Sequence, residues 1–492
     1  MGKGPLIPIA LALLVLLQLG AAWGMRKGPF FMDEGYYITH SWLAANGLVQ
    51  YRDFNDNHAP GIAFLGSALF SLFPASLESA RMLVALSQAL TTAAIFILAR
   101  RIFSERAGIF AAAFYALVIP VMGGSWFVIE SFFTLFATLS ALFLHELIFG
   151  KSKAARLPLL AGALSGCALI FKQPGAAFVA FGAACASLAR WEKGWRARIS
   201  GAAMFLAGAA IPVAACCAYF AANNALLDMA YWTLFFNIEV KGMRDAGFFL
   251  FTLEETLALF VAAGAFAALA ASALRSRSQA DLKLRLFLLF WALSCAALAV
   301  PRFNVFHIMA SIPPIAIFIG GSAAGIGGLF SKGRATARDF LPAAMATAAA
   351  MLLFLACASH YSNSLGGDNI AYLSEIGELI SSRAPPGSRI MAFPTLPYTY
   401  FFSGRLPATK YIGTDPWVAS KETDEDMEAQ MRSSSPVVVA YCNCTGPGYP
   451  PPWEFLPASD AYIRENYVEY ARFRLPSAQK VNATLILMER KE

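Results

Sequence analysis

The sequence predicts a mostly α-helical, polytopic membrane protein that ends in a water-soluble α/β domain. The 492 residues are 58% apolar and only 14% charged, whereas a soluble domain is about one half apolar and one quarter charged. Long apolar runs recur as far as residue 358, and after it prolines and charges increase while no run is long enough to span a bilayer. We therefore expect a membrane domain over residues 1–358 and an α/β domain over 359–492.

A membrane-spanning helix needs roughly 20 apolar residues. On that basis we expect about 11 spans, at residues 5–24, 80–99, 107–122, 127–149, 157–172, 175–189, 199–222, 251–274, 284–300, 305–330 and 340–358. The apolar run 62–74 is shorter, and prolines flank it at both ends. We interpret it as an interfacial or re-entrant helix that does not cross.

The first apolar segment has two readings. It resembles a signal peptide, with Lys3 as a short basic region and Gly20-Ala21-Ala22 as a weak cleavage site. An uncleaved anchor is favoured because further spans follow. Both readings place Asp33 outside the cytoplasm.

The basic residues indicate the orientation of the chain. They occur in clusters between apolar runs, near residues 100–106, 151–156, 190–198, 275–285 and 332–338. If the run 62–74 does not cross, these clusters share one side, which the positive-inside rule makes cytoplasmic. The external loop 25–79, the loop 223–250 and the C-terminal domain are then extracytoplasmic. The net charge of +7 reflects topology rather than nucleic-acid binding.

The two external loops contain aromatic residues suited to the membrane interface. We expect an amphipathic helix from Glu34 to Gly47 in the headgroup layer, ended by Asn46-Gly47. The loop 223–250 has aromatic pairs at both of its ends and reads as interfacial too.

In the C-terminal domain we expect a helix over 368–382 and a charged surface helix over 420–432. The strand candidates are residues 389–393, 398–402, 436–441, 468–473 and 484–488. Six of the eight cysteines lie in apolar segments, which excludes a disulfide framework or zinc site of the usual kind. Cys442 and Cys444 are expected to be water-exposed and free.

Polar groups gather at the external ends of the spans and in the external loops. They are Asp33, Glu34, Arg52, Asp53, Asp56, His58, Glu130, Lys172, Gln173, Arg302 and His307. Charges at membrane depth are costly and usually functional. The structural alternative is that they lie in headgroup water.

Three of these groups have specific structural alternatives. Asp33 could cap a helix that begins at Glu34, and Glu130 could simply complement the dipole at the start of its span. The pair Arg302 and His307 could snorkel to the interface.

One carboxylate surrounded by several cations suits displacement of a phosphate from a sugar. Ordinary glycoside hydrolysis needs a second carboxylic acid to protonate the leaving oxygen. A lipid phosphate leaves as a stable anion, so cations can hold it. The carboxylate can then take the proton from an acceptor hydroxyl as that hydroxyl attacks.

Several motifs, in this order, resemble the GT-C membrane glycosyltransferases, and in particular the protein O-mannosyltransferase and lipid A aminoarabinose transferase group. They are Asp33-Glu34-Gly35-Tyr36-Tyr37, Tyr51-Arg52-Asp53-Phe54, His58-Ala59-Pro60-Gly61, Arg100-Arg101-Ile102-Phe103, Glu130, Lys172-Gln173-Pro174, Phe306-His307 and the segment 400–407. The match extends over nearly the whole chain. It departs from the common pattern at Ala59, where two successive prolines are usual.

The resemblance implies an inverting transfer of a sugar from a polyprenyl-phosphate carrier to an acceptor hydroxyl of a glycan, lipid or protein, outside the cytoplasm. It implies that Asp33 is the base, with Glu34 beside it, and that His58, Lys172 and Arg302 contact the carrier phosphate. We place Arg52, Asp53, Glu130 and His307 in the same substrate site. Members of this group vary in metal use, and the sequence offers no ligand set that assigns a divalent metal.

Two other functions are alternatives for a chain of this kind. A transporter or flippase for lipid-linked sugars predicts ionisable residues along the middle of spans, where this chain has mainly Ala, Leu, Phe and Gly. A non-catalytic scaffold for a cell-envelope complex predicts that loss of Asp33 has no effect.

Overall fold

The computed structural model describes residues 6–28, 30–150, 154, 156–241, 253–276, 278–299, 305–330, 369–445, 450–475 and 482–491. The chain divides into two compact units. Unit 1 comprises Met1–Arg26, Arg81–Cys216 and Leu250–Tyr361, and unit 2 comprises Lys27–Ala80, Cys217–Phe249 and Ser362–Glu492. The segment between the first two expected spans therefore belongs to the same unit as the C-terminal domain.

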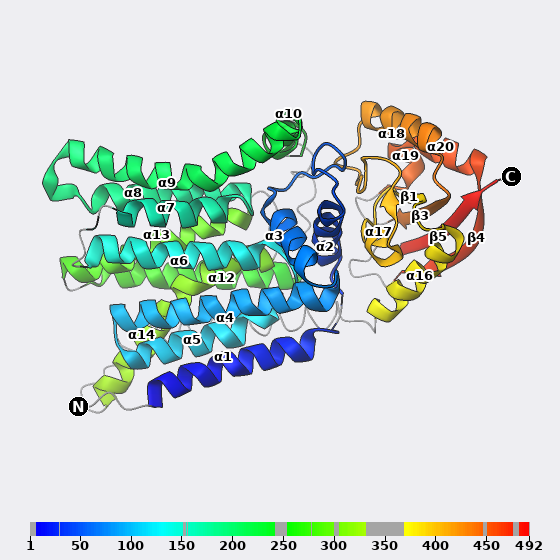
Figure 1. Cartoon of the computed structure of the whole chain (residues 1–492). Coiled ribbons are helices and arrows are strands. Elements are labelled where there is room, and N and C mark those ends of the chain that lie inside the picture. The colour runs from blue at the N-terminus through cyan, green and yellow to red at the C-terminus, as the bar shows by residue number, and fades with distance from the viewer. Residues whose placement is uncertain are drawn as a thin grey trace. The chain divides into compact units, whose positions relative to one another are not determined.

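Every described element of unit 1 is helical, and its long helices run side by side (Figure 1). They are α1 (Leu6–Met25), α4 (Leu77–Ile102), α5 (Glu105–Val121), α6 (Ile129–Phe149), α7 (Arg156–Leu169), α8 (Ala176–Leu188), α9 (Trp195–Ala222), α12 (Leu253–Leu274), α13 (Gln279–Ala296) and α14 (Ile312–Phe330). Short 3-10 turns connect some of them, including η1 (Gln173–Gly175) and η5 (Val305–Ser311).

Small residues allow the backbones of α7 and α9 to approach closely. A Cβ atom on Gly162 would collide with the carbonyl of Phe205, and one on Gly208 would collide with the carbonyl of Leu159. Packing of this kind is common between helices in lipid, where burial of apolar surface does not drive association.

Helices occupy every expected span that the structure describes, and residues 340–358 lie outside the described part. Within the described part of the chain, five helices are long and apolar enough to cross a membrane, namely Leu77–Ile102, Ile129–Phe149, Trp195–Ala222, Gln279–Ala299 and Phe306–Gly325. The chain is an integral membrane protein. The number of about 11 spans stays a prediction.

The first part of unit 2 contains α2 (Met32–Ala45) and α3 (Gly61–Leu72), which pack together. The short helix expected over 62–74 is confirmed by α3. α2 ends where the sequence predicts, because Asn46 is its C-cap residue and Gly47 follows with a φ of 86°. Eight of the 14 residues of α2 are buried in the protein, and its expected position along a membrane surface stays a prediction.

Unit 2 also contains the segment that follows α9. It forms α10 (Leu226–Ala230) and the π-helix η3 (Tyr231–Lys241). Several of its large apolar side chains are exposed, including Leu227, Leu234, Phe235 and Ile238. An interfacial position for this segment stays a prediction.

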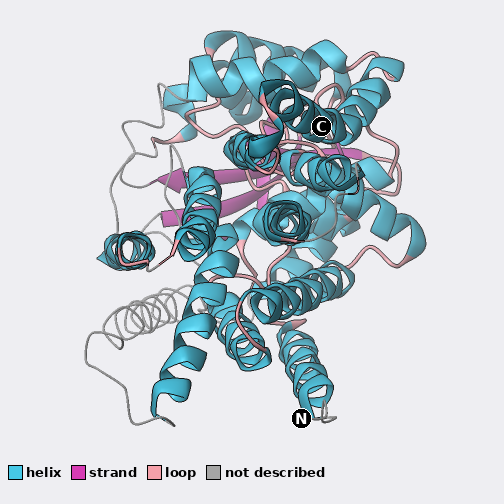
Figure 2. Ribbon diagram, turned by 90° about the vertical axis from the view of Figure 1, so that its left-hand side faces the viewer, coloured by secondary structure: helices cyan, strands magenta, loops and turns pink. Residues whose placement is uncertain are grey.

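The strands, magenta in Figure 2, form one mixed sheet in the order β2-β1-β3-β5-β4. They are β1 (Arg389–Phe393), β2 (Leu406–Pro407), β3 (Val438–Thr445), β4 (Tyr467–Arg474) and β5 (Asn482–Arg490). β1 pairs in parallel with β2 and β3, whereas β5 is antiparallel to β3 and β4.

Helices cover both faces of this sheet (Figure 1). α16 (Asn369–Arg383) lies on one side, and α18 (Lys421–Ser434), α19 (Pro452–Phe455) and α20 (Pro457–Asn466) lie on the other. Alternate strand residues such as Met391, Phe393 and Val439 enter a core with α18 and α20, as the period of two in a strand requires. The expected α/β domain is confirmed.

Two expectations for this domain are wrong. Residues 398–402 form not a strand but part of the helix α17 (Tyr398–Ser403), which starts after Pro397 and ends at Gly404, in the left-handed conformation with a φ of 62°. Cys442 and Cys444 are neither free nor exposed, because they form a disulfide in the buried central strand β3.

Candidate functional site

The candidate base Asp33 lies in the first turn of α2. The helix begins at Met32 and its N-cap residue is Phe31, which makes no side-chain capping bond. The structural alternative, in which Asp33 caps the helix, is therefore wrong. Its carboxylate is half-buried and makes no hydrogen bond or ion pair within the described part of the chain. The dipole of α2 favours a negative charge at this end.

The start of α2 is anchored within unit 2 by aromatic side chains. Phe30 packs edge-on against Tyr398 and Phe402, with ring centroids at 5.4 and 5.6 Å. A Cβ atom on Gly35 would collide with the ring of Phe30, so this position has no room for a larger residue. Glu34, beside Asp33, is completely buried. Asp33 is thus carried by a rigid turn.

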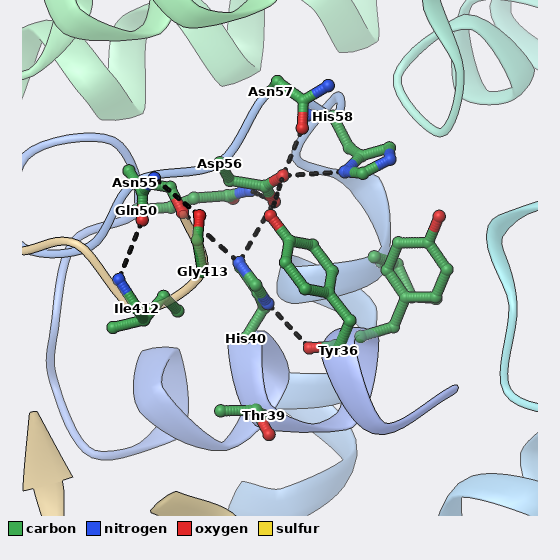
Figure 3. Close-up of polar contacts among 12 residues, drawn as sticks. Tyr36, Thr39, His40, Gln50, Asn55, Asp56, Asn57, His58, Ile412 and Gly413 are labelled. Carbon is green, nitrogen blue, oxygen red and sulfur yellow. Dashed lines mark hydrogen bonds and ion pairs between the residues drawn. The ribbon is translucent and has the colours of Figure 1, made fainter. Parts of the chain in front are cut away.

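A second carboxylate, Asp56, is the centre of a buried polar network (Figure 3). Its Oδ1 accepts hydrogen bonds from the Tyr36 hydroxyl at 3.1 Å, and from the backbone N and the ring Nδ1 of His58 at 2.9 and 2.8 Å. Its Oδ2 accepts a hydrogen bond of 2.6 Å from Gln50 and lies 3.6 Å from Nε2 of His40. The carboxylate is satisfied on both oxygens.

This environment keeps Asp56 ionised. Burial alone would raise its pKa, but the charges of His40 and His58 and the hydrogen bonds from His58 lower the pKa of Asp56 to about 2. Burial, together with the neighbouring Asp56 carboxylate, raises the pKa of Tyr36 well above its usual value. Tyr36 therefore remains a hydrogen-bond donor.

The residues on either side of Asp56 attach the loop to other parts of unit 2. The Oδ1 of Asn55 accepts a 3.0 Å hydrogen bond from the backbone N of Ile412, and its Nδ2 donates to the carbonyl of Gly413 at 3.3 Å. Asn57 exchanges hydrogen bonds with Asn237 of η3, at 2.7 and 3.2 Å. The loop therefore joins α2, η3 and the C-terminal domain.

Arg52 and Asp53 pair with each other. Two guanidinium nitrogens of Arg52 lie 2.7 and 2.8 Å from the two carboxylate oxygens of Asp53, and a third donates to the carbonyl of Asn223. Asp53 also accepts from the backbone N of Val49. These contacts fix the turn that precedes the Asp56 network, and their assignment to substrate binding stays a prediction.

In unit 1, three of the predicted site residues meet. Nζ of Lys172 lies 2.5 Å from Oε1 of Glu130, and Nε2 of His307 lies 3.7 Å from the same oxygen. Glu130 is completely buried, and its Oε2 has no hydrogen-bond partner in the described part of the chain. The helix α6, the turn before η1 and the 3-10 helix η5 bring these residues together.

The predicted site residues therefore fall into two groups. Asp33, Glu34, Arg52, Asp53 and His58 belong to unit 2, whereas Glu130, Lys172 and His307 belong to unit 1. Arg302 lies outside the described residues. Convergence of the two groups on one substrate stays a prediction.

Sequence reasoning gave Asp56 no particular role, and it did not identify His40 or Gln50. The run Asn55-Asp56-Asn57-His58, four polar residues in succession, was the available indication. Among the described residues no group of three or more His, Cys, Asp or Glu side chains is arranged to hold a metal ion.

Residues 57–221 match the sequence family described as dolichyl-phosphate-mannose-protein mannosyltransferase. The matched region includes His58, Glu130 and Lys172 and begins after Asp33. The structure of ArnT from Cupriavidus metallidurans in the apo state is similar, with a TM-score of 0.57 at 14% identity over 98% of this chain and 97% of that chain. The resemblance to the GT-C glycosyltransferases is confirmed.

Two further GT-C structures contain lipid phosphates. ArnT bound to undecaprenyl phosphate has a TM-score of 0.52 at 13% identity, over 97% of both chains. The oligosaccharyltransferase AglB from Archaeoglobus fulgidus, in complex with an inhibitory peptide and a dolichol-phosphate, has a TM-score of 0.52 at 12% identity, over 99% of this chain and 76% of that chain. At these identities the likeness establishes the GT-C fold. No curated protein matches the sequence.

Proposed function

We propose that this protein is an inverting glycosyltransferase that moves a sugar from a polyprenyl-phosphate carrier to an acceptor hydroxyl. The match of residues 57–221 to the mannosyltransferase family carries this proposal. It is supported by the similarity in fold to ArnT and AglB, whose structures contain undecaprenyl phosphate and dolichol-phosphate.

Asp33 is the base in this proposal. The acceptor oxygen attacks the anomeric carbon from the side opposite the phosphate, and its proton passes to the Asp33 carboxylate. The bond between the anomeric carbon and the phosphate oxygen breaks, and its electron pair leaves with the polyprenyl phosphate. A carboxylate with no partner in the described chain, on a rigid helix, suits this role because no internal cation competes for its charge.

The group around Glu130 supplies contacts to the donor. Lys172 and His307 provide the cationic side for the phosphate, and Arg302 is assigned to the same task by the resemblance.

The site is assigned to the extracytoplasmic side. Structural disulfides persist mainly in oxidising compartments, and the bond between Cys442 and Cys444 therefore supports this side for the C-terminal domain. The distribution of Lys and Arg agrees with it. Alkaline phosphatase fused after Glu492 and expressed in a bacterial host should be active, whereas an inactive fusion would contradict this orientation.

The experiment that tests the function is a transfer assay on the purified full-length protein. A panel of polyprenyl-phosphate sugars is supplied with membrane lipid, glycan and peptide acceptors, and the release of polyprenyl phosphate is measured. Release by the wild type and its loss in Asp33→Asn support the proposal. Equal rates in both proteins would overturn the assignment of the base.

A further inference from the structure

His58 is held at its backbone and its ring. Its backbone N donates to Asp56, its carbonyl accepts a 2.7 Å hydrogen bond from the Tyr51 hydroxyl, and its ring Nδ1 lies 2.8 Å from Asp56. The rings of Tyr36 and Tyr37 contact the imidazole edge-on, with centroids at 5.5 and 5.4 Å. The imidazole therefore has a single orientation.

That orientation leaves the other ring nitrogen open. With Nδ1–H donated to Asp56, Nε2 lies on the far side of the ring from the carboxylate (Figure 3). Nε2 has no hydrogen-bond partner in the described part of the chain, and the side chain is 26% exposed. A carboxylate behind a histidine is a common way to set which nitrogen carries the proton and where the other one points.

We propose that Asp56 is a positioning residue that aims Nε2–H of His58 at an oxygen of the carrier phosphate. The inference rests on the proposed function only in taking a lipid phosphate as the ligand. In an imidazolium both ring nitrogens are donors, so Nδ1–H can stay on Asp56 while Nε2–H reaches the phosphate. No proton is transferred in this step, since the imidazolium holds the phosphate before and after the sugar leaves.

The number of hydrogen bonds that the Asp56 carboxylate accepts supports this role. A loop can be folded with far fewer contacts than four hydrogen bonds to one buried carboxylate. Such a network fixes a functional side chain within the narrow tolerance that binding requires. The amides of Asn55 and Asn57 secure the same loop from both sides, so the aim of Nε2 depends on three elements of unit 2.

The test measures binding of undecaprenyl phosphate, without a sugar, to the full-length protein in lipid nanodiscs. Four variants are compared with the wild type: Asp56→Asn, His58→Ala, His58→Gln and the double variant Asp56→Asn/His58→Ala. We expect Asp56→Asn and His58→Ala each to weaken binding by about tenfold. The double variant should be no weaker than His58→Ala, because Asp56 acts through His58.

Rescue by a conservative variant separates positioning from a merely structural role. His58→Gln keeps an N–H donor on the side chain, whereas His58→Ala removes it. His58→Gln should therefore bind undecaprenyl phosphate more tightly than His58→Ala. A merely structural role of the imidazole predicts the same loss of binding in both variants.

Asp424→Asn is the matched control. Asp424 is also a buried, multiply bonded carboxylate of unit 2, and it accepts from the backbone N of Ala458 and Ser459. Asp424→Asn should lower the melting temperature without changing the affinity for undecaprenyl phosphate.

Additive losses in the double variant, the same loss of binding in His58→Gln and His58→Ala, or no binding by the wild type would each overturn the inference. Normal phosphate binding without sugar transfer would overturn the proposed function and leave this inference standing.

Discussion

Nζ of Lys172 lies 2.5 Å from Oε1 of Glu130, although the residues are 42 positions apart in the sequence. The carboxylate is completely buried and the lysine side chain is 11% exposed. Pairs of this kind contribute little net stability when intact, because removing both charges from water is expensive. Removing one partner is costly, since the other charge stays buried without compensation.

Lys172→Met should therefore destabilise the protein by about 3 kcal/mol, measured as a lower melting temperature in detergent. The double variant Glu130→Gln/Lys172→Met should recover most of this loss. Lys283→Met is the control, because Lys283 is exposed in the same unit and its loss should change stability little. A double variant as unstable as the single one would contradict the pairing.

Asp33→Asn should reduce transfer by about 10³-fold, the scale of a lost general base, with little change in melting temperature. Stability is spared because the carboxylate makes no hydrogen bond in the described part of the chain. Glu422→Gln is the control, since Glu422 is also an acid in the first turn of a unit 2 helix. A large fall in melting temperature for Asp33→Asn would indicate a structural role instead.

Asp56 should make the stability of unit 2 sensitive to acid. Its pKa is about 2 in the folded protein against an ordinary value of 3.8, so the folded state binds its proton less readily than the unfolded one. The stabilisation is complete above about pH 5 and is lost as the pH falls through 4 toward 2. It amounts to about 2 kcal/mol. Chemical unfolding at several pH values should show this loss in the wild type and a smaller one in Asp56→Asn.

Asn55→Ala should destabilise unit 2 by about 1–3 kcal/mol, because it leaves the buried backbone N of Ile412 without an acceptor. Asn466→Ala provides the comparison, since the side chain of Asn466 donates, among the described residues, only to the carbonyl of Tyr462 one helical turn earlier. Thermal unfolding followed by tryptophan fluorescence measures both. Equal losses of stability in the two variants would mean that the hydrogen bond to Ile412 contributes no more than the local one to Tyr462.

Apolar length identified the helices of unit 1, since a helix in lipid satisfies its own backbone and needs no distant partner. The helix at residues 398–403 was missed because Tyr398, Thr399 and Phe401 favour strands by residue type. Pro397 and Gly404 set its limits, and packing against α2 within unit 2 supports it. Tertiary context outweighed local preference there.

The candidate site was predictable only in part. Asp33, His58, Glu130 and Lys172 stood out as charges near apolar runs. The role of Asp56 was hidden, because its donors come from positions 20 and six residues earlier as well as from its close neighbour His58. Hydrogen bonds between residues so far apart leave no periodic pattern in the sequence. Cys442 and Cys444 were also expected to be exposed, yet β3 lies between β1 and β5 and is covered on both faces.

The hydrogen bonds of Asn55 to residues 412 and 413 have a practical meaning for anyone who exchanges parts between relatives. A chimera that replaces only the segment after residue 362 would supply both backbone partners from a foreign loop and would put a foreign surface against α2. A graft should carry residues 27–80 together with the segment after residue 362. The loop that contains Asp56 and the C-terminal domain that binds this loop then come from the same protein.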